Sequence, residues 1–136
     1  EWNIIADPQA AKEVFESGLD LYMVPLDATN KVLIKQKDLR PWKQGDVKAK
    51  MVADLYNILF DSYDFTTTEI FDLTAATIMV LPEACIFQQL HLDDITEEGT
   101  TLGQTMVVPD LEPNINVCLN RDATRIKQAL DTTFSK

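Results

Sequence analysis

One carboxylate, Asp72, stands inside the apolar stretch Ile70-Phe71-Asp72-Leu73, which continues to Ala76. In the first turn of a helix, free backbone N–H groups and the helix dipole favour such a negative charge, so Asp72 could be a simple capping carboxylate. It could instead bind a hard cation such as calcium, which takes about six to eight oxygen ligands, several of them carboxylates. The residues leave both interpretations open, and one carboxylate cannot complete a calcium site.

A second polar pair lies at the start of the sequence, where Glu1 and Asn3 flank Trp2. In an extended segment, alternate side chains point to opposite faces, so Glu1 and Asn3 would share a face and Trp2 would pack on the other. A carboxylate accepts hydrogen bonds and a carboxamide donates and accepts them, which suits a polyhydroxylated ligand. The alternative is a frayed polar terminus.

The motifs of several large enzyme classes are absent from the sequence. It contains no GxGxxG, GxxxxGK, HExxH or GxSxG pattern, which argues against dinucleotide-binding enzymes, P-loop NTPases, zinc peptidases and serine hydrolases of the elbow type. The one histidine, His91, lies between Leu90 and Leu92 in a predicted strand, where alternation places it opposite the two leucines. We therefore interpret His91 as an exposed strand residue and not as a catalytic base.

The two cysteines, Cys85 and Cys118, have apolar neighbours and lack the CxxC spacing of metal and redox sites. We expect two buried reduced thiols, with a disulfide as the alternative. No apolar run approaches the roughly 18 residues of a membrane span, and no signal-peptide pattern opens the sequence. These features predict a cytoplasmic protein without a membrane partner.

The composition is that of one soluble globular domain, with 136 residues, 46% hydrophobic and 25% charged. Twelve Lys and Arg against 22 Asp and Glu give a net charge of −10. Such a charge repels nucleic-acid phosphates and anionic lipids, so we expect no nucleic-acid partner. Because the first residue is Glu1 and not Met, we also expect the chain to begin inside a longer protein.

Alternating helices and strands must position these residues. Asp7-Pro8 predicts a helix over residues 8–17 that ends at Gly18, and the apolar run 19–26 predicts a buried strand. The polar segment 27–45 has room for one helical turn near residues 36–39. From Asp46 a helix is predicted to about residue 61, and its apolar stripe is expected to be core: Val47, Met51, Val52, Leu55, Ile58 and Leu59.

The second half of the sequence changes from helical to strand periodicity. After a Thr-rich connection, residues 70–81 predict an apolar helix that ends at Pro82. Strands are expected over residues 85–92, 104–108 and 114–119, with a turn at Glu97-Glu98-Gly99, and a last helix begins near Asp122. This succession predicts an α/β fold in which the later strands form a hairpin or a sheet edge.

An ordered set of segments resembles the inosine-uridine preferring nucleoside hydrolase family. Glu1-Trp2-Asn3 is similar to the family's Glu-Phe-Asn, and Asp7-Pro8-Gln9-Ala10-Ala11 to its Asp-Pro-Glu-Ala-Ala. Leu26-Asp27-Ala28-Thr29 is similar to its Leu-Asp-Val-Thr, and Phe71-Asp72-Leu73-Thr74-Ala75 to its His-Asp-Pro-Leu-Ala. Similar matches follow at residues 97–105 and 113–117, so the resemblance covers essentially the whole chain.

The resemblance implies a three-layer open α/β sheet, with residues 1–136 as the C-terminal portion of a single domain. It implies a calcium-dependent enzyme that hydrolyses the N-glycosidic bond of a nucleoside substrate: the metal activates water and an aspartate takes the proton. By position, Asp72 would bind calcium, and Glu1 and Asn3 would hold ribose hydroxyls. The family also implies a homo-oligomer, either a dimer or a tetramer.

The sequence departs from the family pattern in two ways. The family's acidic cluster Asp-Thr-Asp-Pro-Gly-x-Asp-Asp, which brings most calcium ligands and the catalytic base, has no counterpart here, so we expect no catalytic residue in this chain and no activity from it alone. Phe71 replaces a leaving-group histidine of uridine-using members; a phenyl ring cannot donate a proton but can stack on a purine. A degenerate, inactive relative and a non-catalytic interaction module are the alternatives.

Overall fold

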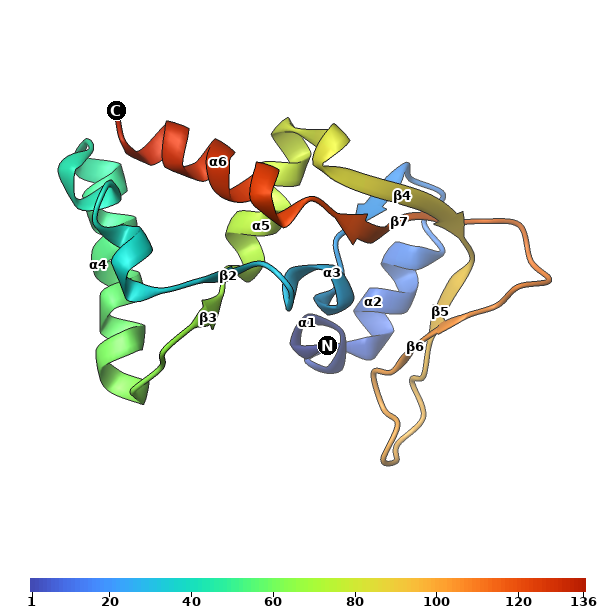
Figure 1. Ribbon diagram of the computed structural model, residues 1–136. Coiled ribbons are helices and arrows are strands. Elements are labelled where there is room, and N and C mark those ends of the chain that lie inside the picture. The colour runs from blue at the N-terminus through green and yellow to red at the C-terminus, as the bar shows by residue number, and fades with distance from the viewer. The chain divides into compact units, whose positions relative to one another are not determined.

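The computed structural model describes residues 1–136, which divide into two compact units. Unit 1 comprises residues 1–26 and 86–120, and unit 2 comprises residues 27–85 and 121–136 (Figure 1). Helices and strands are mixed along the chain, so the predicted α/β class is confirmed. In each unit, chain segments that are distant in sequence share one core.

The helices are α1 (Trp2–Ile5), α2 (Pro8–Phe15), α3 (Leu26–Thr29), α4 (Val47–Tyr63), α5 (Phe71–Val80) and α6 (Ala123–Phe134). Three short 3-10 helices are η1 (Gln36–Leu39), η2 (Trp42–Gln44) and η3 (Pro82–Ala84). The strands are β1 (Leu21–Met23), β2 (Leu33–Ile34), β3 (Thr68–Glu69), β4 (Cys85–Leu90), β5 (Leu92–Asp94), β6 (Thr105–Val107) and β7 (Ile115–Arg121).

The sheet of unit 1 has β7 between β1 and β4 (Figure 1). β1 and β7 run parallel, with Leu21 opposite Ile115 and Met23 opposite Val117. Side chains of α2, β5 and β7 form the core on this sheet: Phe15, Leu92, Ile115 and Val117. This apolar contact holds α2 against the strands of unit 1.

The start of α2 agrees with the prediction, because the Asp7 side chain accepts a hydrogen bond from the backbone N–H of Ala10 at 3.0 Å. The helix ends at Phe15, and Gly18 follows in the left-handed conformation with φ of 72°. The predicted strand 19–26 is wrong in length, since β1 covers only three residues. Pro25 has no N–H for a sheet ladder, and Leu26 already begins α3.

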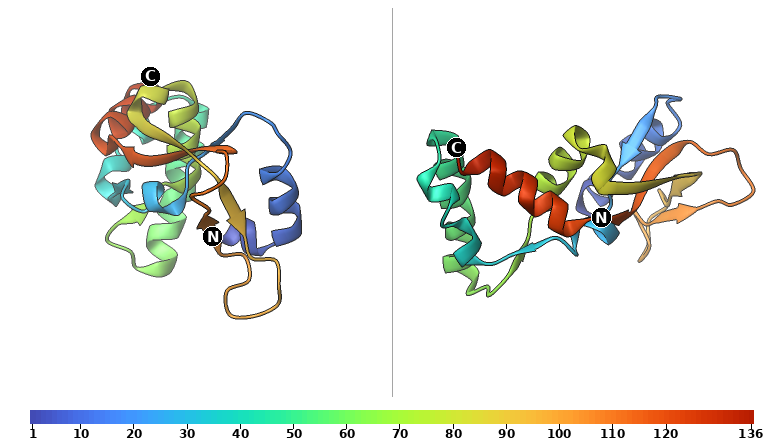
Figure 2. Two further views of the ribbon diagram at one scale, coloured as in Figure 1. Left: turned by 90° about the vertical axis from the view of Figure 1, so that its right-hand side faces the viewer. Right: turned by 45° about the horizontal axis from the view of Figure 1, so that its top comes forward.

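The strand predicted over residues 85–92 is divided at His91 into β4 and β5. The Nδ1 atom of His91 lies 2.6 Å from the carbonyl oxygen of Glu112, so the ring is tied to the backbone and is only half-buried. β5 pairs with β6 in an antiparallel hairpin that projects away from the sheet (Figure 2). His91 is thus not a strand residue, and its contact is structural.

Unit 2 is built around Trp42, which is 1% exposed. The indole Nε1 donates a hydrogen bond to the Asp131 side chain at 2.8 Å, and the ring lies 4.9 Å from that of Phe134 on α6. The Asp46 carboxylate caps α4 by accepting hydrogen bonds from the N–H groups of Lys48 and Ala49, each at 2.9 Å. The first turn of α4 and the last turn of α6 are therefore held together.

The predicted apolar stripe of α4 is not core, which corrects the interpretation of its periodicity. Val47 is 77% exposed, Met51 63% and Leu55 53%. The buried residues lie on another face of the helix: Ala49, Ala53 and Phe60. Small alanine side chains let η1 and η2 approach this face closely, and periodicity alone does not distinguish it from the larger stripe.

The expectation of reduced thiols is also wrong, and its stated alternative, disulfide-bonded cysteines, is confirmed. Cys85 and Cys118 are buried as expected, but neither is free and both are disulfide-bonded. The predicted cytoplasmic location therefore loses the support of reduced thiols. None of the helices combines the length and the apolar character that a membrane crossing requires.

Candidate functional site

Phe71 and Asp72 form the first two residues of α5 in unit 2. Ile70 occupies the N-cap position, and no side chain makes a capping hydrogen bond there. Asp72 is exposed and does not cap the helix, although the helix dipole still favours a negative charge in this turn. The carboxylate is therefore available to a ligand outside the helix, and the Phe71 ring next to it is 41% exposed.

The phenol of Tyr56, on α4, lies close enough to Asp72 to feel its charge. Burial, and to a smaller extent the negative charge of Asp72, raises the pKa of Tyr56 to about 12. The phenol keeps its proton at neutral pH and remains a hydrogen-bond donor. Sequence reasoning missed Tyr56, because its place beside Asp72 depends on how α4 packs in unit 2.

This chain offers one candidate ligand for a calcium ion, but it does not gather a complete calcium site. Among residues 1–136, no group of three or more His, Cys, Asp or Glu side chains could hold a metal ion. Asp72 has the right chemistry for one position, since calcium prefers carboxylate oxygens. A calcium ion at Asp72 would need further oxygen ligands that residues 1–136 do not gather there.

Glu1 and Asn3 belong to unit 1, and the structure corrects their predicted arrangement. The segment is the helix α1 and not an extended strand, with the N–H of Ile5 bonded to the carbonyl oxygen of Glu1 at 3.0 Å. Residues two apart on a helix point about 200° away from each other, so Glu1 and Asn3 do not share a face. Trp2 is 81% exposed and does not pack on the opposite side.

The Glu1 carboxylate nevertheless has a defined position at the carboxyl end of β1. Its Oε1 atom accepts a hydrogen bond from the backbone N–H of Leu26 at 3.0 Å, shortly after β1 ends at Met23. Ligands of open α/β sheets bind outside the carboxyl ends of the strands. Glu1 is thus held where a ligand of this sheet is expected.

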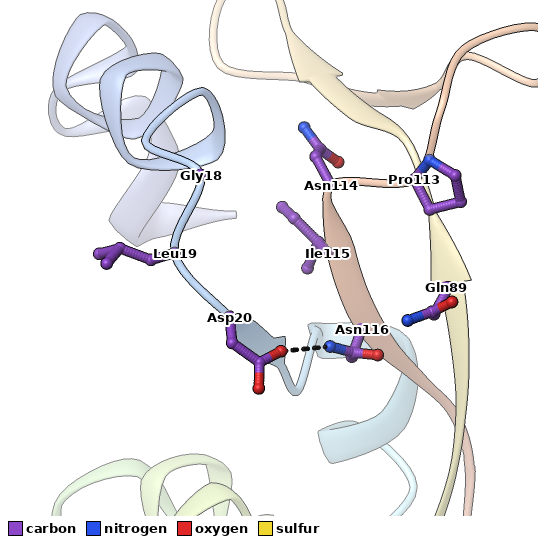
Figure 3. Close-up of a pocket in the computed structure, with 8 residues that line it drawn as sticks. All are labelled: Gly18, Leu19, Asp20, Gln89, Pro113, Asn114, Ile115 and Asn116. Carbon is purple, nitrogen blue, oxygen red and sulfur yellow. Dashed lines mark hydrogen bonds between the residues drawn. The ribbon is translucent and has the colours of Figure 1, made fainter.

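A hollow of about 290 Å³ in unit 1 lies at the amino ends of β1 and β7, which begin at Leu21 and Ile115 (Figure 3). The Asn116 amide donates hydrogen bonds to the Asp20 side chain and to the carbonyl oxygen of Leu21, both at 3.1 Å. These polar groups satisfy each other, and none of the predicted site residues lines the hollow. Glu1 and this hollow therefore lie at opposite ends of β1.

Comparison with known proteins identifies the family of this chain. Residues 1–128 match the family model described as inosine-uridine preferring nucleoside hydrolase. The chain is a member of this family. The resemblance inferred from the ordered motifs is thereby confirmed over nearly the whole chain.

Among curated nucleoside hydrolases, a probable ribonucleoside hydrolase of Dictyostelium discoideum is 32% identical over 133 residues, which are 87% of this chain and 39% of the relative. A non-specific ribonucleoside hydrolase of Salmonella newport is 30% identical over 141 residues, covering 99% of this chain and 45% of the relative. The chain thus spans less than half the length of these relatives.

Solved structures of nucleoside hydrolases have the same fold. A plant nucleoside hydrolase matches with a TM-score of 0.84 and 21% identity over 99% of this chain and 47% of that structure. A purine-preferring ribonucleoside hydrolase from Gardnerella vaginalis matches with a TM-score of 0.82 and 23% identity over 96% of this chain and 45% of that structure. At these identities the likeness establishes the nucleoside hydrolase type of α/β fold.

Proposed function

We propose that the complete polypeptide carrying this chain hydrolyses the N-glycosidic bond of ribonucleosides. The observation that carries the proposal is the family match over residues 1–128, supported by curated relatives that are named ribonucleoside hydrolases. The reaction replaces the bond between the base and the anomeric carbon with a bond from that carbon to water. Positive charge develops on the sugar, so groups that hold the ribose hydroxyls in the transition state favour bond breaking.

Asp72 is the residue that we assign to calcium. Its support is an exposed carboxylate without a capping role, at the position of the family's His-Asp-Pro-Leu-Ala motif. A bound calcium ion would supply a site that orients and acidifies the attacking water. The remaining ligands and the base that takes the proton lie outside residues 1–136 in this proposal.

Glu1 and Asn3 are assigned to the ribose hydroxyls. The hydrogen bond between the Glu1 carboxylate and Leu26 supports this role for Glu1, because it fixes one carboxylate oxygen at the ligand end of β1 and leaves the other free to accept from a hydroxyl. Asn3 is exposed on α1 and has only the family position in its favour.

Phe71 is assigned to the base, with a preference for purines. A partly exposed phenyl ring next to Asp72 can stack on a nucleobase but cannot protonate it. A purine bicycle offers a larger stacking surface than a pyrimidine ring. Removal of the ring by Phe71→Ala should therefore reduce activity on inosine more than activity on uridine.

The family also favours a homo-oligomer, either a dimer or a tetramer, which sedimentation of the complete polypeptide would test. A cytoplasmic location stays a prediction. The disulfide-bonded cysteines weigh against it, because cytosolic thiols are normally kept reduced.

The proposal is tested by incubating the complete polypeptide with inosine, guanosine and uridine in the presence of calcium and measuring free base and reducing sugar. Equal amounts of base and ribose, lost when a chelator removes calcium, are the expected result. The absence of ribose from all three nucleosides, in a folded and calcium-loaded protein, would favour a degenerate relative without activity.

A further inference from the structure

The positive charge of this acidic chain is concentrated in one segment. Between residues 31 and 50 lie seven of the twelve Lys and Arg, with only two carboxylates, Asp38 and Asp46. The net charge of −10, from which we expected no nucleic-acid partner, therefore conceals a basic region. The proposed hydrolysis of nucleosides assigns no role to these cations.

The local conformation aligns three of these cations on one side of the chain. Residues 36–39 and 42–44 form η1 and η2, and Arg40 and Pro41 between them have right-handed helical angles. In a 3-10 helix, residues three apart lie above one another, so Lys37, Arg40 and Lys43 form one row. Leu39 and Trp42 belong to a second row, which is buried at 0% and 1% exposure.

The three cations line a hollow of about 330 Å³ in unit 2, together with Gln36 and Asn57. The Gln36 amide donates hydrogen bonds to the side chains of Asn57 at 3.3 Å and Asp61 at 3.1 Å, which braces η1 against α4. The buried row and this amide bridge fix the backbone beneath the hollow. The backbone that carries the three cationic side chains is therefore held in place by packing and hydrogen bonds.

None of the three cations makes an ion pair. The ion pairs of the structure use Lys12, Arg125 and Lys127 as their cations. Asp38, the carboxylate nearest in sequence, is bonded to Lys127 at 3.3 Å and to the N–H of Lys35 at 3.0 Å. Asp61 is the carboxylate tied to the edge of the hollow, through Gln36. Asp38 still interacts with Lys37, whose charge helps to lower the pKa of Asp38. Three positive charges outside any ion pair thus share one concave surface.

We propose that this hollow binds a small phosphate-bearing anion, such as a phosphomonoester or pyrophosphate. Arg40 can bind two phosphate oxygens with its planar guanidinium, and Lys37 and Lys43 supply compact charges. A volume near 330 Å³ is at the lower end of small-molecule sites, which hold roughly 300–1,000 Å³. An extended polyanion would leave the hollow and meet the acidic remainder of the surface.

Calorimetric titration of the complete polypeptide with inorganic phosphate and with pyrophosphate, at constant ionic strength, tests this site. The double variant Arg40→Gln/Lys43→Gln removes two cations from the hollow. The matched control Lys48→Gln/Lys50→Gln removes two exposed cations from the same basic segment that do not line the hollow. We expect saturable binding of pyrophosphate to the wild type and the control, and at least tenfold weaker binding to the hollow variant.

Circular dichroism of each variant verifies that an affinity loss does not come from unfolding; all four substituted side chains are exposed. If the hollow variant unfolds, the single variant Lys37→Gln, expected to weaken binding severalfold, takes its place. The site is ruled out by unsaturable binding in the wild type, or by an equal loss in the control and the hollow variant. Tighter binding of a single-stranded oligonucleotide than of pyrophosphate would also overturn the small-anion proposal.

Discussion

The negative charge of Asp72 acts on the phenol of Tyr56 and contributes to the raised pKa of that phenol. One side chain comes from the first turn of α5 and the other from α4. The sequence motif was enough to find Asp72, because a carboxylate in an apolar helix is rare. Tyr56 was not found, since nothing in the spacing of the two residues shows that α4 brings the phenol to Asp72.

Burial and the charge of Asp72 together give Tyr56 a high pKa, about 12 instead of the ordinary 10. Because burial is the larger cause and the charge of Asp72 the second, Asp72→Asn should lower the pKa of Tyr56 without returning it to 10. NMR of ring-labelled tyrosine across a pH titration measures this. Asp61→Asn, on the same helix as Tyr56, is the control and should leave the Tyr56 titration unchanged. An unaltered Tyr56 pKa in Asp72→Asn would contradict the electrostatic effect of Asp72 on Tyr56.

Asp94 on β5 predicts a pH dependence of stability. It is 5% exposed, both carboxylate oxygens lack a hydrogen-bond partner, and burial raises its pKa above the ordinary 3.8. A raised pKa means that the folded state binds the proton more tightly, so stability falls as pH rises from 3.8 through the pKa of folded Asp94. Asp94→Asn should therefore stabilise the protein at neutral pH by about 1 kcal/mol.

The neighbouring Asp93 gives the matched control for Asp94. A hydrogen bond from Lys12 at 2.6 Å lowers the pKa of Asp93, so its stabilising effect is present above pH 3.8 and is lost below it. Asp93→Asn should destabilise at neutral pH, opposite in sign to Asp94→Asn. Urea unfolding of both variants at several pH values measures the two signs; destabilisation by Asp94→Asn at pH 7 would contradict the account of Asp94.

At the scale of the elements, the close approach of α4 and α6 rests on Gly45. A Cβ atom at Gly45 would overlap the carbonyl oxygen of Phe134 and lie 2.8 Å from the Cβ of Ala49. Because a backbone carbonyl at a helix end cannot move aside freely, Gly45→Ala should cost up to about 3 kcal/mol of unfolding free energy.

Gly18→Ala is the comparison for Gly45→Ala, because Gly18 has no atom within 4 Å of an added Cβ but has a φ of +72°. Only the cost of the left-handed conformation applies there, roughly 1 kcal/mol. Urea denaturation followed by circular dichroism should show the larger loss for Gly45→Ala. An equal or smaller loss would mean that α4 and α6 do not meet as described.

The sequence predicted elements best where a local hydrogen bond defines them. Asp7, Asp46 and Asp122 cap helices that begin where the sequence predicted a helix start, and Pro82 ends α5 as expected. The failures depend on tertiary packing: α1 is helical where alternation suggested a strand, and the large apolar stripe of α4 is exposed. Periodicity identifies a face of a helix but not which neighbour covers it.

At the scale of the whole molecule, the chain spans less than half of its curated relatives. In the proposed function, residues 1–136 therefore carry only some of the groups that bind substrate and calcium. Asp72, Glu1 and Asn3 were singled out by their residue types and neighbours, and the family motifs gave them and Phe71 their expected roles; both depend only on sequence. The basic hollow was not foreseen, because total charge averages a basic segment with an acidic remainder.

We therefore expect residues 1–136, prepared alone, to bind calcium no better than about millimolar and to release no ribose from inosine. A single candidate carboxylate cannot replace the several that calcium takes. Calcium titration and a ribose assay measure both properties. Metal-dependent ribose release by the isolated chain at ordinary enzyme rates, roughly 1–1,000 per second, would contradict the assignment of the catalytic groups to another part of the polypeptide.

The central claim, that Asp72 serves a calcium-dependent nucleoside hydrolase, is tested most directly by Asp72→Asn in the complete polypeptide. The substitution keeps the size of the side chain and one oxygen but removes the charge, so stability should change by well under ~1 kcal/mol. Calcium affinity and the rate of ribose release at saturating calcium should both fall by about tenfold to a hundredfold, the scale seen even for changes around metal ligands. Asp61→Asn should alter neither; unchanged affinity and rate in Asp72→Asn would contradict the claim.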